Sequence, residues 1–359
     1  MSVNNEAILN QPFADWTEAA ENGDNIVIST RLRLARNLER EKFPQYLNGD
    51  EAKTVALKIK EAIYKYEQSP LNKDKFNYYD LATLNNVQRQ VLFEKHFISK
   101  NLVGKSLGRE VIINDKQNLA IMINEEDHLR MQCILPGLQL QKGWETISQL
   151  DDALDYYLNF AYDSKLGYLT ACPSNVGTGL RASVMLHLPA LKMTNKLEIL
   201  FQQLAKFGMT VRGVYGEGSK SYGSLYQISN QVTIGYSEAE IIERLHKVVA
   251  EFIAQEKQAR HFLMENSSKT ILDYIWRSYG ILANARMLTA KECMEQLSVM
   301  RLGVALGILK DTPKEIKIED LNQLMIHCQP AFLLLESGED LPPEERDWLR
   351  AEIVRKYFR

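Results

Sequence analysis

The stretch TACPSNVGTGLRASV, from Thr170 to Val184, brings a cysteine, a proline, two glycines and an arginine together ahead of an apolar segment. Glycines let a backbone approach a ligand closely, and an arginine can grip phosphate oxygens with two hydrogen bonds. A turn that serves structure alone has little need of a thiol. The stretch therefore predicts a turn that binds a ligand, followed by a helix over Leu180–Leu191.

The composition is that of a globular protein without an unusual partner class. The 359 residues are 45% hydrophobic and 25% charged, with a net charge of −3, so neither nucleic acid nor a membrane surface is favoured as a partner. The chain opens without a signal-peptide pattern and contains no apolar run long enough to span a membrane. We therefore expect a cytoplasmic protein.

The cysteines are widely spaced and form no CxxC pair, which predicts neither a zinc site nor a disulfide framework. Cys133, Cys293 and Cys328 are expected to be core thiols. Cys172 differs because of its glycine-rich neighbours. His128 and His187 are expected to be structural.

Strand and helix signals alternate in the first part of the chain. Strands are expected over 25–37, 165–172, 209–213 and 226–235, and helices over 51–66 and 237–266. Two further strands, joined by an acidic turn, are expected within 118–135. The residues after 266 have helical periodicity. We expect an extension over 1–24, an α+β catalytic domain over 25–258 and a helical C-terminal domain over 259–359.

Arginines at strand ends and turns predict phosphate binding. Any one of them would ordinarily be a surface charge, but five occur beside glycine-rich or acidic turns: Arg31, Arg33, Arg130, Arg181 and Arg212. Phosphoryl transfer depends on positioning and charge neutralisation. The GxxxxGK[ST], HRD and DFG motifs are absent from the sequence, which leaves a nucleotide site built mainly from arginines.

The acidic turn NEEDHLR, Asn124–Arg130, is either a solvated hairpin turn or a positioned carboxylate. A carboxylate beside the Cys172 thiol suits a planar cation such as a guanidinium. The pKa of a free guanidinium is about 12.5 to 13.8, so its nitrogen becomes a nucleophile only when a base takes a proton.

The segments STRLRLARN, NEEDHLR and CPSNVGTGLRAS together resemble the phosphagen (guanidino) kinase family, in the same order over about 25–251. The resemblance implies a mostly antiparallel sheet flanked by helices and transfer of the γ-phosphoryl of ATP to a guanidinium. It implies Glu126 as the carboxylate that holds and deprotonates the guanidinium, with Cys172 against it. Mg²⁺ would arrive with ATP, without a protein ligand.

The resemblance also implies the nucleotide site. The five arginines would hold phosphates, His96 would lie near the adenine, and the loop RGVYGEG would close over the nucleotide. The residues expected to contact ATP are Ser29, Thr30, Arg31, Leu32, Arg33, His96, Arg130, Arg181, Ala182, Ser183, Val184, Met185, Arg212, Gly213, Val214, Tyr215, Gly216 and Glu217.

The chain departs from the small-molecule members of the family in two ways. They carry a helical domain ahead of the catalytic body, whereas only the short extension 1–24 precedes the first matching strand here, so we expect an open acceptor site. Thr233 stands where they carry another phosphate-binding arginine. With its helical C-terminal domain, the chain resembles the bacterial protein arginine kinases, whose acceptor is an arginine side chain of a protein.

Near the C-terminus, Arg346 and Arg350 fall on one face of an expected helix, beside Asp347. Ordinary surface charges would give the same pattern. The segment RDWLRA, however, resembles the motif by which protein arginine kinases bind phosphoarginine away from the active site. The implied allosteric residues are Arg346, Asp347, Arg350 and Ala351. Trp348 is expected to pack the last helix.

The resemblance extends to partners and to a role in stress response and protein quality control. It implies protein substrates that include a heat-shock-type transcription repressor, a zinc-finger activator protein and downstream Clp-type protease machinery. The apolar run AFLLL, Ala331–Leu335, is expected to be exposed and suits a homodimer. Two alternatives remain: a kinase for free arginine or a related guanidino compound, and a non-catalytic phosphoarginine-binding adaptor.

Overall fold

The computed structural model describes residues 14–18, 25–70, 72, 74–104, 107–214 and 221–359. An eight-stranded sheet forms its centre, with the strand order β2-β3-β4-β5-β1-β8-β10-β9. Every neighbouring pair in this sheet is antiparallel. The expected α+β fold with a mostly antiparallel sheet is confirmed.

The strands of the sheet are short apart from the central β1. They are β1 (Val27–Arg36), β2 (Phe76–Asp80), β3 (Glu110–Asn114), β4 (Leu119–Ile123), β5 (Leu129–Pro136), β8 (Leu180–His187), β9 (Met209–Gly213) and β10 (Leu225–Asn230). A separate hairpin consists of β6 (Tyr162–Asp163) and β7 (Gly167–Tyr168).

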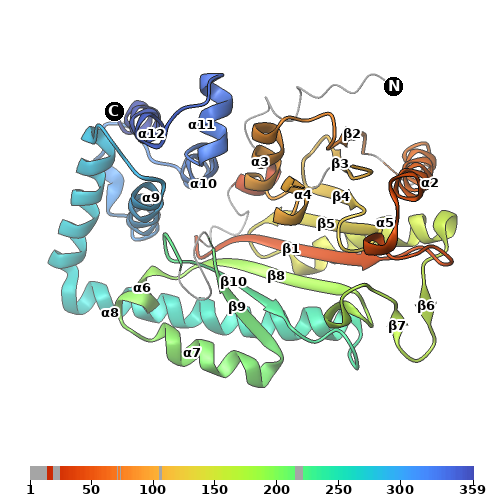
Figure 1. Ribbon diagram of the computed structural model, residues 1–359. Helices are drawn as coiled ribbons and strands as arrows, with labels where there is room; N and C mark the ends of the chain where they lie inside the picture. Colours follow the sequence, from red (N-terminus) through yellow and green to blue (C-terminus); the bar gives the residue numbers. More distant parts are fainter. Residues whose placement is uncertain (1–13, 19–24, 71, 73, 105–106, 215–220) are drawn as a thin grey trace.

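Helices flank the sheet and form the C-terminal region (Figure 1). They are α2 (Gly49–Glu67), α3 (Asn86–Glu94), α4 (Lys100–Gly104), α5 (Leu140–Leu158), α6 (Pro189–Met193), α7 (Leu197–Leu204), α8 (Glu238–Asn284), α9 (Ala290–Ala305), α10 (Ile318–His327), α11 (Pro330–Ser337) and α12 (Pro343–Phe358). Short 3-10 turns cover Asp15–Thr17, Pro44–Tyr46, Pro173–Asn175, Ala205–Phe207 and Leu309–Asp311. No helix of the described residues is both long and apolar enough to cross a membrane.

The apolar face of β1 fixes the sheet against α5. Leu32 and Leu34 alternate with arginines along the strand and are fully buried. Gly143 of α5 packs so closely that an added Cβ would lie 2.5 Å from Leu32 Cδ1. The two layers therefore meet closely at Gly143, where a larger residue would have to displace the Leu32 side chain.

Helix α8 joins the sheet to the C-terminal helices. It begins at Ser237, whose side chain and Glu240 form a capping box, so the helix expected over 237–266 is confirmed. It continues to Asn284 after a break in helical geometry at Ser267. In Figure 1 it runs beneath the sheet and then turns toward the C-terminal helices. The expected boundary between 258 and 259 therefore falls inside α8.

The helix predicted over Leu180–Leu191 is wrong. The chain forms strand β8 there, and only the short α6 follows it. Leu180, Ala182 and Val184 are fully buried on one face, whereas Arg181 is only partly buried on the other. This alternation is the period of a strand. The strand predicted over 165–172 shrinks to the two residues of β7.

Two predictions about exposure in the C-terminal region are also wrong. Ala331, Phe332 and Leu333 are buried, because α11 packs into the core that it shares with α3. Trp348 is 49% exposed and does not pack the last helix. Helix α12 instead buries a different set of apolar side chains: Ala351, Val354 and Phe358.

Candidate active site

Strand register brings the five arginines onto one face of the sheet. Arg33 on β1 lies directly opposite Arg181 on β8, and Ala35 lies opposite Arg130 on β5. Arg212 on β9 lies opposite Gln227 of β10, which pairs with Met185 of β8. Opposed residues of antiparallel strands share a face, as do residues two apart on one strand. Arg31 therefore lies on the same face as the other four.

This arginine face, defined by Arg31, Arg33, Arg130, Arg181 and Arg212, carries an excess of positive charge. Burial, together with Arg130 and Arg181, lowers the pKa of Arg31 to about 9. The pKa of Arg33 also falls well below its usual value, through burial and then through repulsion by its neighbours. An anion that binds among these side chains would favour their charged forms and raise both pKa values again.

Unpartnered donors on the arginine face fit a phosphate ligand. Arg33 Nε and Arg181 Nε are buried and have no hydrogen-bond partner among the described residues. Arg31 Nε, by contrast, donates to Gln132 Oε1 at 3.0 Å. Guanidinium donors that are buried without acceptors are costly, and phosphate oxygens would satisfy them.

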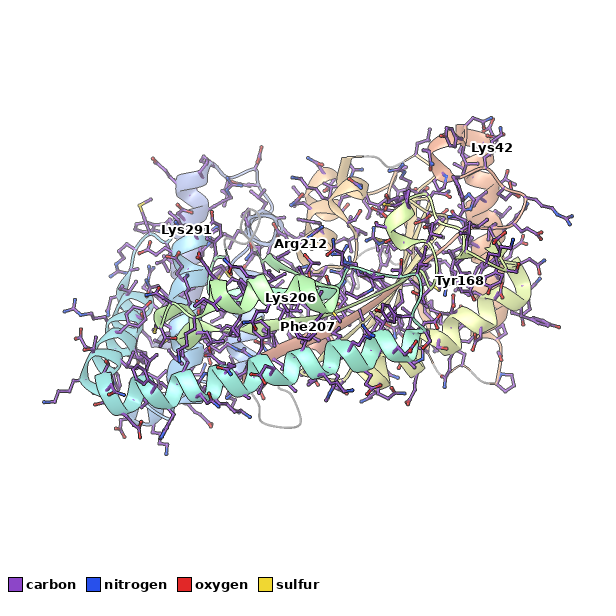
Figure 2. The ribbon with its side chains drawn as sticks, turned by 90° about the horizontal axis from the view of Figure 1, so that it is seen from below. Lys42, Tyr168, Lys206, Phe207, Arg212 and Lys291 are labelled. Carbon is purple, nitrogen blue, oxygen red and sulfur yellow. The ribbon has the colours of Figure 1, made fainter. Side chains whose placement is uncertain are left out.

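A neighbouring arginine shows what a structural arginine looks like. Arg36 is buried, with Nη2 donating to Asp151 Oδ2 at 2.7 Å and Nε to Oδ1 at 3.0 Å. Its guanidinium carbon lies 3.5 Å from the centre of the Tyr168 ring. Figure 2 shows Tyr168 at the opposite end of the molecule from Lys291, with Arg212 between them. Arg36 is fully partnered and holds the fold.

The other expected nucleotide residues divide between the two faces. Register places Ser29, Ser183 and Met185 with the arginines. Leu32, Ala182 and Val184 belong to the opposite, apolar core, and the Thr30 hydroxyl donates to Gly137 O at 2.7 Å. Side chains on the opposite face cannot meet a ligand on the arginine face. Gly213 and Val214 end β9, while Tyr215, Gly216 and Glu217 lie outside the described residues.

His96 borders the arginine face through its backbone. Its carbonyl oxygen accepts from Gln132 Nε2 at 2.7 Å and from Arg31 Nη2 at 3.4 Å. Burial lowers the pKa of the ring to about 3, so the imidazole is neutral. The ring lies 5.5 Å from that of Trp16, centre to centre. No sequence motif pointed to Gln132 or Trp16 at this place.

The two adjacent glutamates of the acidic turn, Glu125 and Glu126, have different interaction partners. Glu125 is buried and accepts from Arg130 Nη1 at 2.7 Å and from Ser99 Oγ at 2.6 Å. Glu126 is half-buried and lies beside the thiol of Cys172, whose Sγ is 3.0 Å from Ser174 Oγ. Burial, then Asp127 and Glu125, raise the pKa of Glu126 above its usual value. Glu126 is therefore the carboxylate of the turn that is available to a ligand.

Asp127 ties the acidic turn to the cysteine loop. Its Oδ1 accepts from Ala171 N at 2.7 Å and from Asn37 Nδ2 at 2.6 Å. These bonds place Cys172, the next residue after Ala171, beside Glu126. The sequence analysis missed this role of Asp127, because it depends on contacts between distant segments.

The cysteine loop, residues 170–179, is held from the other side by Thr233. Its hydroxyl donates to Val176 O at 2.7 Å, with Ser174 O at 3.1 Å. Gly177 has a φ of 110°, and a Cβ there would lie 2.3 Å from Thr233 O. Thr233 therefore supports the loop.

A cleft of about 480 Å³ opens beside Glu126. Its lining includes Glu125, Arg109 and Ala171, together with the exposed Gln45 and Asn101 at the rim. The cleft is polar, reachable from solvent and adjacent to Cys172, so it can admit a side chain. Arg109 is a further residue that the sequence analysis missed.

His128 and His187 are hydrogen-bonded within the fold, and three of the four cysteines are buried. His128 accepts from Leu38 N at Nδ1 and bonds Lys42 O through Nε2, and His187 bonds Ser298 Oγ at 2.7 Å. Cys133, Cys293 and Cys328 are buried, whereas Cys172 is partly exposed. No group of three potential metal ligands occurs among the residues that the structure describes.

The RDWLRA segment lies on α12, next to the start of α11. Arg350 is 2% exposed and donates to Cys328 O and Leu288 O, each at 2.7 Å, and to Asp347 Oδ1. Arg346 and Asp347 are half-exposed, and Ala351 is buried. The four expected allosteric residues are thus together, although Arg350 already serves the fold.

Comparison with known families agrees with this geometry. Residues 55–259 match the model described as ATP:guanido phosphotransferase, C-terminal catalytic domain. Residues 268–359 match the model described as protein-arginine kinase McsB C-terminal domain. The class is therefore an ATP-dependent phosphotransferase of the guanidino kinase type.

Relatives extend the match over nearly the whole chain. A protein-arginine kinase of Halothermothrix orenii is 43% identical over 348 residues, covering 97% of each chain. One of Bacillus cereus is 41% identical, covering 99% of this chain and 98% of that one. The chain belongs to the protein-arginine kinase family, and it is an enzyme.

Solved structures share the catalytic fold. A duplicated taurocyamine kinase of Schistosoma mansoni, with bound transition-state-analogue components, has a TM-score of 0.58 and 30% identity. The match covers 70% of this chain and 35% of that one. A lombricine kinase has a TM-score of 0.56 and 25% identity, covering 70% and 76%.

Proposed function

We propose that this enzyme transfers the γ-phosphoryl of ATP to the guanidinium of arginine side chains in proteins. One observation carries the proposal: a carboxylate and a thiol, Glu126 and Cys172, meet at an open polar cleft beside an arginine face with unpartnered donors. The relatives named protein-arginine kinase support a protein acceptor.

In this proposal the triphosphate lies on the arginine face. Arg33 and Arg181 use their free Nε donors, and Arg31 exchanges Gln132 for a phosphate oxygen. The remaining expected contacts come from Ser29, Ser183, Met185, His96, Gly213 and Val214, and those of Tyr215, Gly216 and Glu217 lie outside the described residues. Thr30, Leu32, Ala182 and Val184 would act through their backbone at most. Mg²⁺ would arrive with ATP and neutralise charge on its phosphates.

The acceptor guanidinium would enter the cleft with Glu126 and Cys172 against it. Glu126 takes one N–H proton, and the freed nitrogen forms a bond to the γ-phosphorus. The bond from that phosphorus to the bridging oxygen breaks, and its electron pair leaves with ADP. The products are phosphoarginine, ADP and a proton held on Glu126. The raised pKa of Glu126 makes it a stronger base than an ordinary carboxylate.

Product recognition at RDWLRA would regulate the enzyme. Arg346 and Arg350 suit the phosphoryl group, Asp347 suits the guanidinium, and Ala351 leaves room beside them. The site lies on α12, whereas the catalytic groups lie on the sheet and its loops. Phosphoarginine bound there would act on activity without entering the active site.

The wider role follows from the chemistry of the product. Phosphorylation turns a cationic arginine into an anion, which would release a heat-shock-type transcription repressor from DNA phosphates. The same mark would direct proteins to Clp-type protease machinery in stress response. A cytoplasmic location, a zinc-finger activator protein and a homodimer complete the proposal.

The test uses purified protein, Mg²⁺-ATP and an arginine-rich protein, with excess free arginine in a parallel reaction. Mass spectrometry at neutral pH would find phosphate on protein arginines, unchanged by free arginine. Glu126→Gln and Cys172→Ala should lose it, while Glu41→Gln, a carboxylate paired with Lys58 outside the site, should keep it. Phosphate on free arginine alone would indicate a small-molecule kinase. Phosphoarginine binding without turnover would indicate an adaptor.

A further inference from the structure

A buried carboxylate from the catalytic domain caps a helix of the C-terminal region. Glu94, at the end of α3, is 7% exposed. Both its oxygens accept from Ala331 N at 3.1 Å, and Oε2 also accepts from Phe332 N at 3.3 Å. These donors are in the first turn of α11, so an anion already occupies the positive end of that helix.

The same carboxylate lies in the field of the RDWLRA arginines. Burial raises its pKa to about 7, whereas the amides of Ala331 and Phe332, and then Arg350 and Arg346, favour its charged form. Among the described residues, Arg350 donates its hydrogen bonds to Cys328 O, Leu288 O and Asp347 rather than to Glu94. The attraction is therefore electrostatic, and another anion near these arginines competes with Glu94.

The two residues that follow Glu94, Lys95 and His96, lead from α11 to the arginine face. Lys95 is buried, with Nζ 5.8 Å from the centre of the Phe332 ring. The carbonyl of His96 then accepts from Arg31 Nη2 and from Gln132 Nε2. The segment Glu94–His96 thus touches the start of α11 and a phosphate-binding arginine at once.

A second glutamate in the molecule makes the same type of cap without such a link. Glu256 accepts from Ala190 N at 3.2 Å and from Leu191 N at 2.9 Å, in the first turn of α6. Both capped helices start with proline followed by alanine. Glu256 is paired directly with Arg260 Nε at 2.9 Å, so its cap is a structural one.

We propose that Glu94 is a positioning residue that transmits the state of the RDWLRA site to Arg31. This inference rests on the proposed phosphoarginine site. A phosphorylated guanidine bound beside Arg346 and Arg350 weakens the hold of α11 on Glu94. The segment Glu94–His96 then relaxes, and Arg31 is released from the His96 carbonyl toward the nucleotide phosphates. Phosphoarginine therefore tightens ATP binding.

The experiment measures the Kd of ATP for the full chain by calorimetry, with and without free phosphoarginine. For the wild type we expect phosphoarginine to lower this Kd at least about fivefold, a normal size for allosteric coupling. Glu94→Gln should bind ATP tightly from the start and show no further change. Glu94→Asp keeps the charge but shortens the reach, and it should lose the coupling as well.

Glu256→Gln is the matched control and should couple as the wild type does. Circular dichroism checks that each variant is folded. Full coupling in Glu94→Gln and Glu94→Asp would overturn the role of Glu94 and leave the phosphoarginine site standing. A wild type that binds no phosphoarginine would overturn both the role of Glu94 and the phosphoarginine site. Neither result decides the proposed kinase reaction, which is tested separately by the detection of phosphate on protein arginines.

Discussion

The two faces of the central sheet are built from the same strands but by opposite rules. Along β1, Leu32 and Leu34 enter an apolar core that is closed by α5, whereas Arg31 and Arg33 lie on the arginine face. On the first face, the apolar side chains are stabilised by packing against one another. On the second, like charges stand opposite each other and buried donors lack acceptors.

The difference teaches that one face stabilises the fold and the other is arranged for a ligand. Like charges opposed across strands cost roughly 0.2–1 kcal/mol, and each buried donor without a partner costs about 1–3 kcal/mol. A chain would not keep such a face for stability. A polyanion that binds there would return much of this cost.

The largest expected effect concerns the rim of the arginine face. Glu126→Gln should lower kcat by about 10²- to 10⁴-fold, because the acceptor loses its general base. The Kd of ATP should stay unchanged, since the phosphate donors are intact. Steady-state kinetics and ATP titration measure the two. A variant with near-normal kcat would remove Glu126 from the chemistry.

The next effect concerns the apolar face. Leu32→Ala should lower the free energy of unfolding by about 2–5 kcal/mol, since it opens a cavity against Gly143 of α5. Denaturant titration measures this loss. At denaturant concentrations below the unfolding transition, the ATP affinity of the variant should remain close to that of the wild type. A large loss of ATP affinity in folded protein would show that the two faces are not separable.

A smaller effect is expected on the arginine face itself. Arg181→Met should weaken ATP binding about 10- to 100-fold, the worth of a charged hydrogen bond of roughly 1.5–3 kcal/mol. The free energy of unfolding should not fall. Arg277→Met, which removes an exposed arginine on α8, is the control and should change neither quantity. Equal ATP affinity in both variants would contradict the assignment of the face.

The smallest effect is a displacement of the pH profile. Because the pKa of Glu126 is raised above the usual 4.5, the residue stays protonated and inactive as a base to a higher pH. The acid limb of kcat/KM should therefore turn above pH 4.5. An inflection at or below that value would be inconsistent with Glu126 as the base.

Sequence patterns predicted the candidate site residues more readily than their arrangement. The five arginines, Glu126 and Cys172 could be named from short motifs. That all five arginines share a face depends on register across β5, β1, β8, β10 and β9, which no single segment contains. The same limit hid Asp127, Gln132 and Arg109, whose roles depend on distant partners.

The error at β8 has a local cause. The segment LRASVMLH contains good helix formers, and its apolar content drew a helix prediction. Its period of two was nevertheless present, with Leu180, Ala182 and Val184 on the buried face. Pairing on both sides with β1 and β10 overrides the helical preference of the individual residues.

The most direct test of the central claim is thermal unfolding of Arg33→Leu with and without Mg²⁺-ATP. Arg33 has a buried donor without a partner among the described residues, opposite Arg181. A charge that is buried without a partner carries a desolvation cost, which an apolar side chain of similar size removes. We expect a Tm without nucleotide equal to or above that of the wild type, and loss of the stabilisation by Mg²⁺-ATP. A lower Tm with the nucleotide effect retained would contradict it.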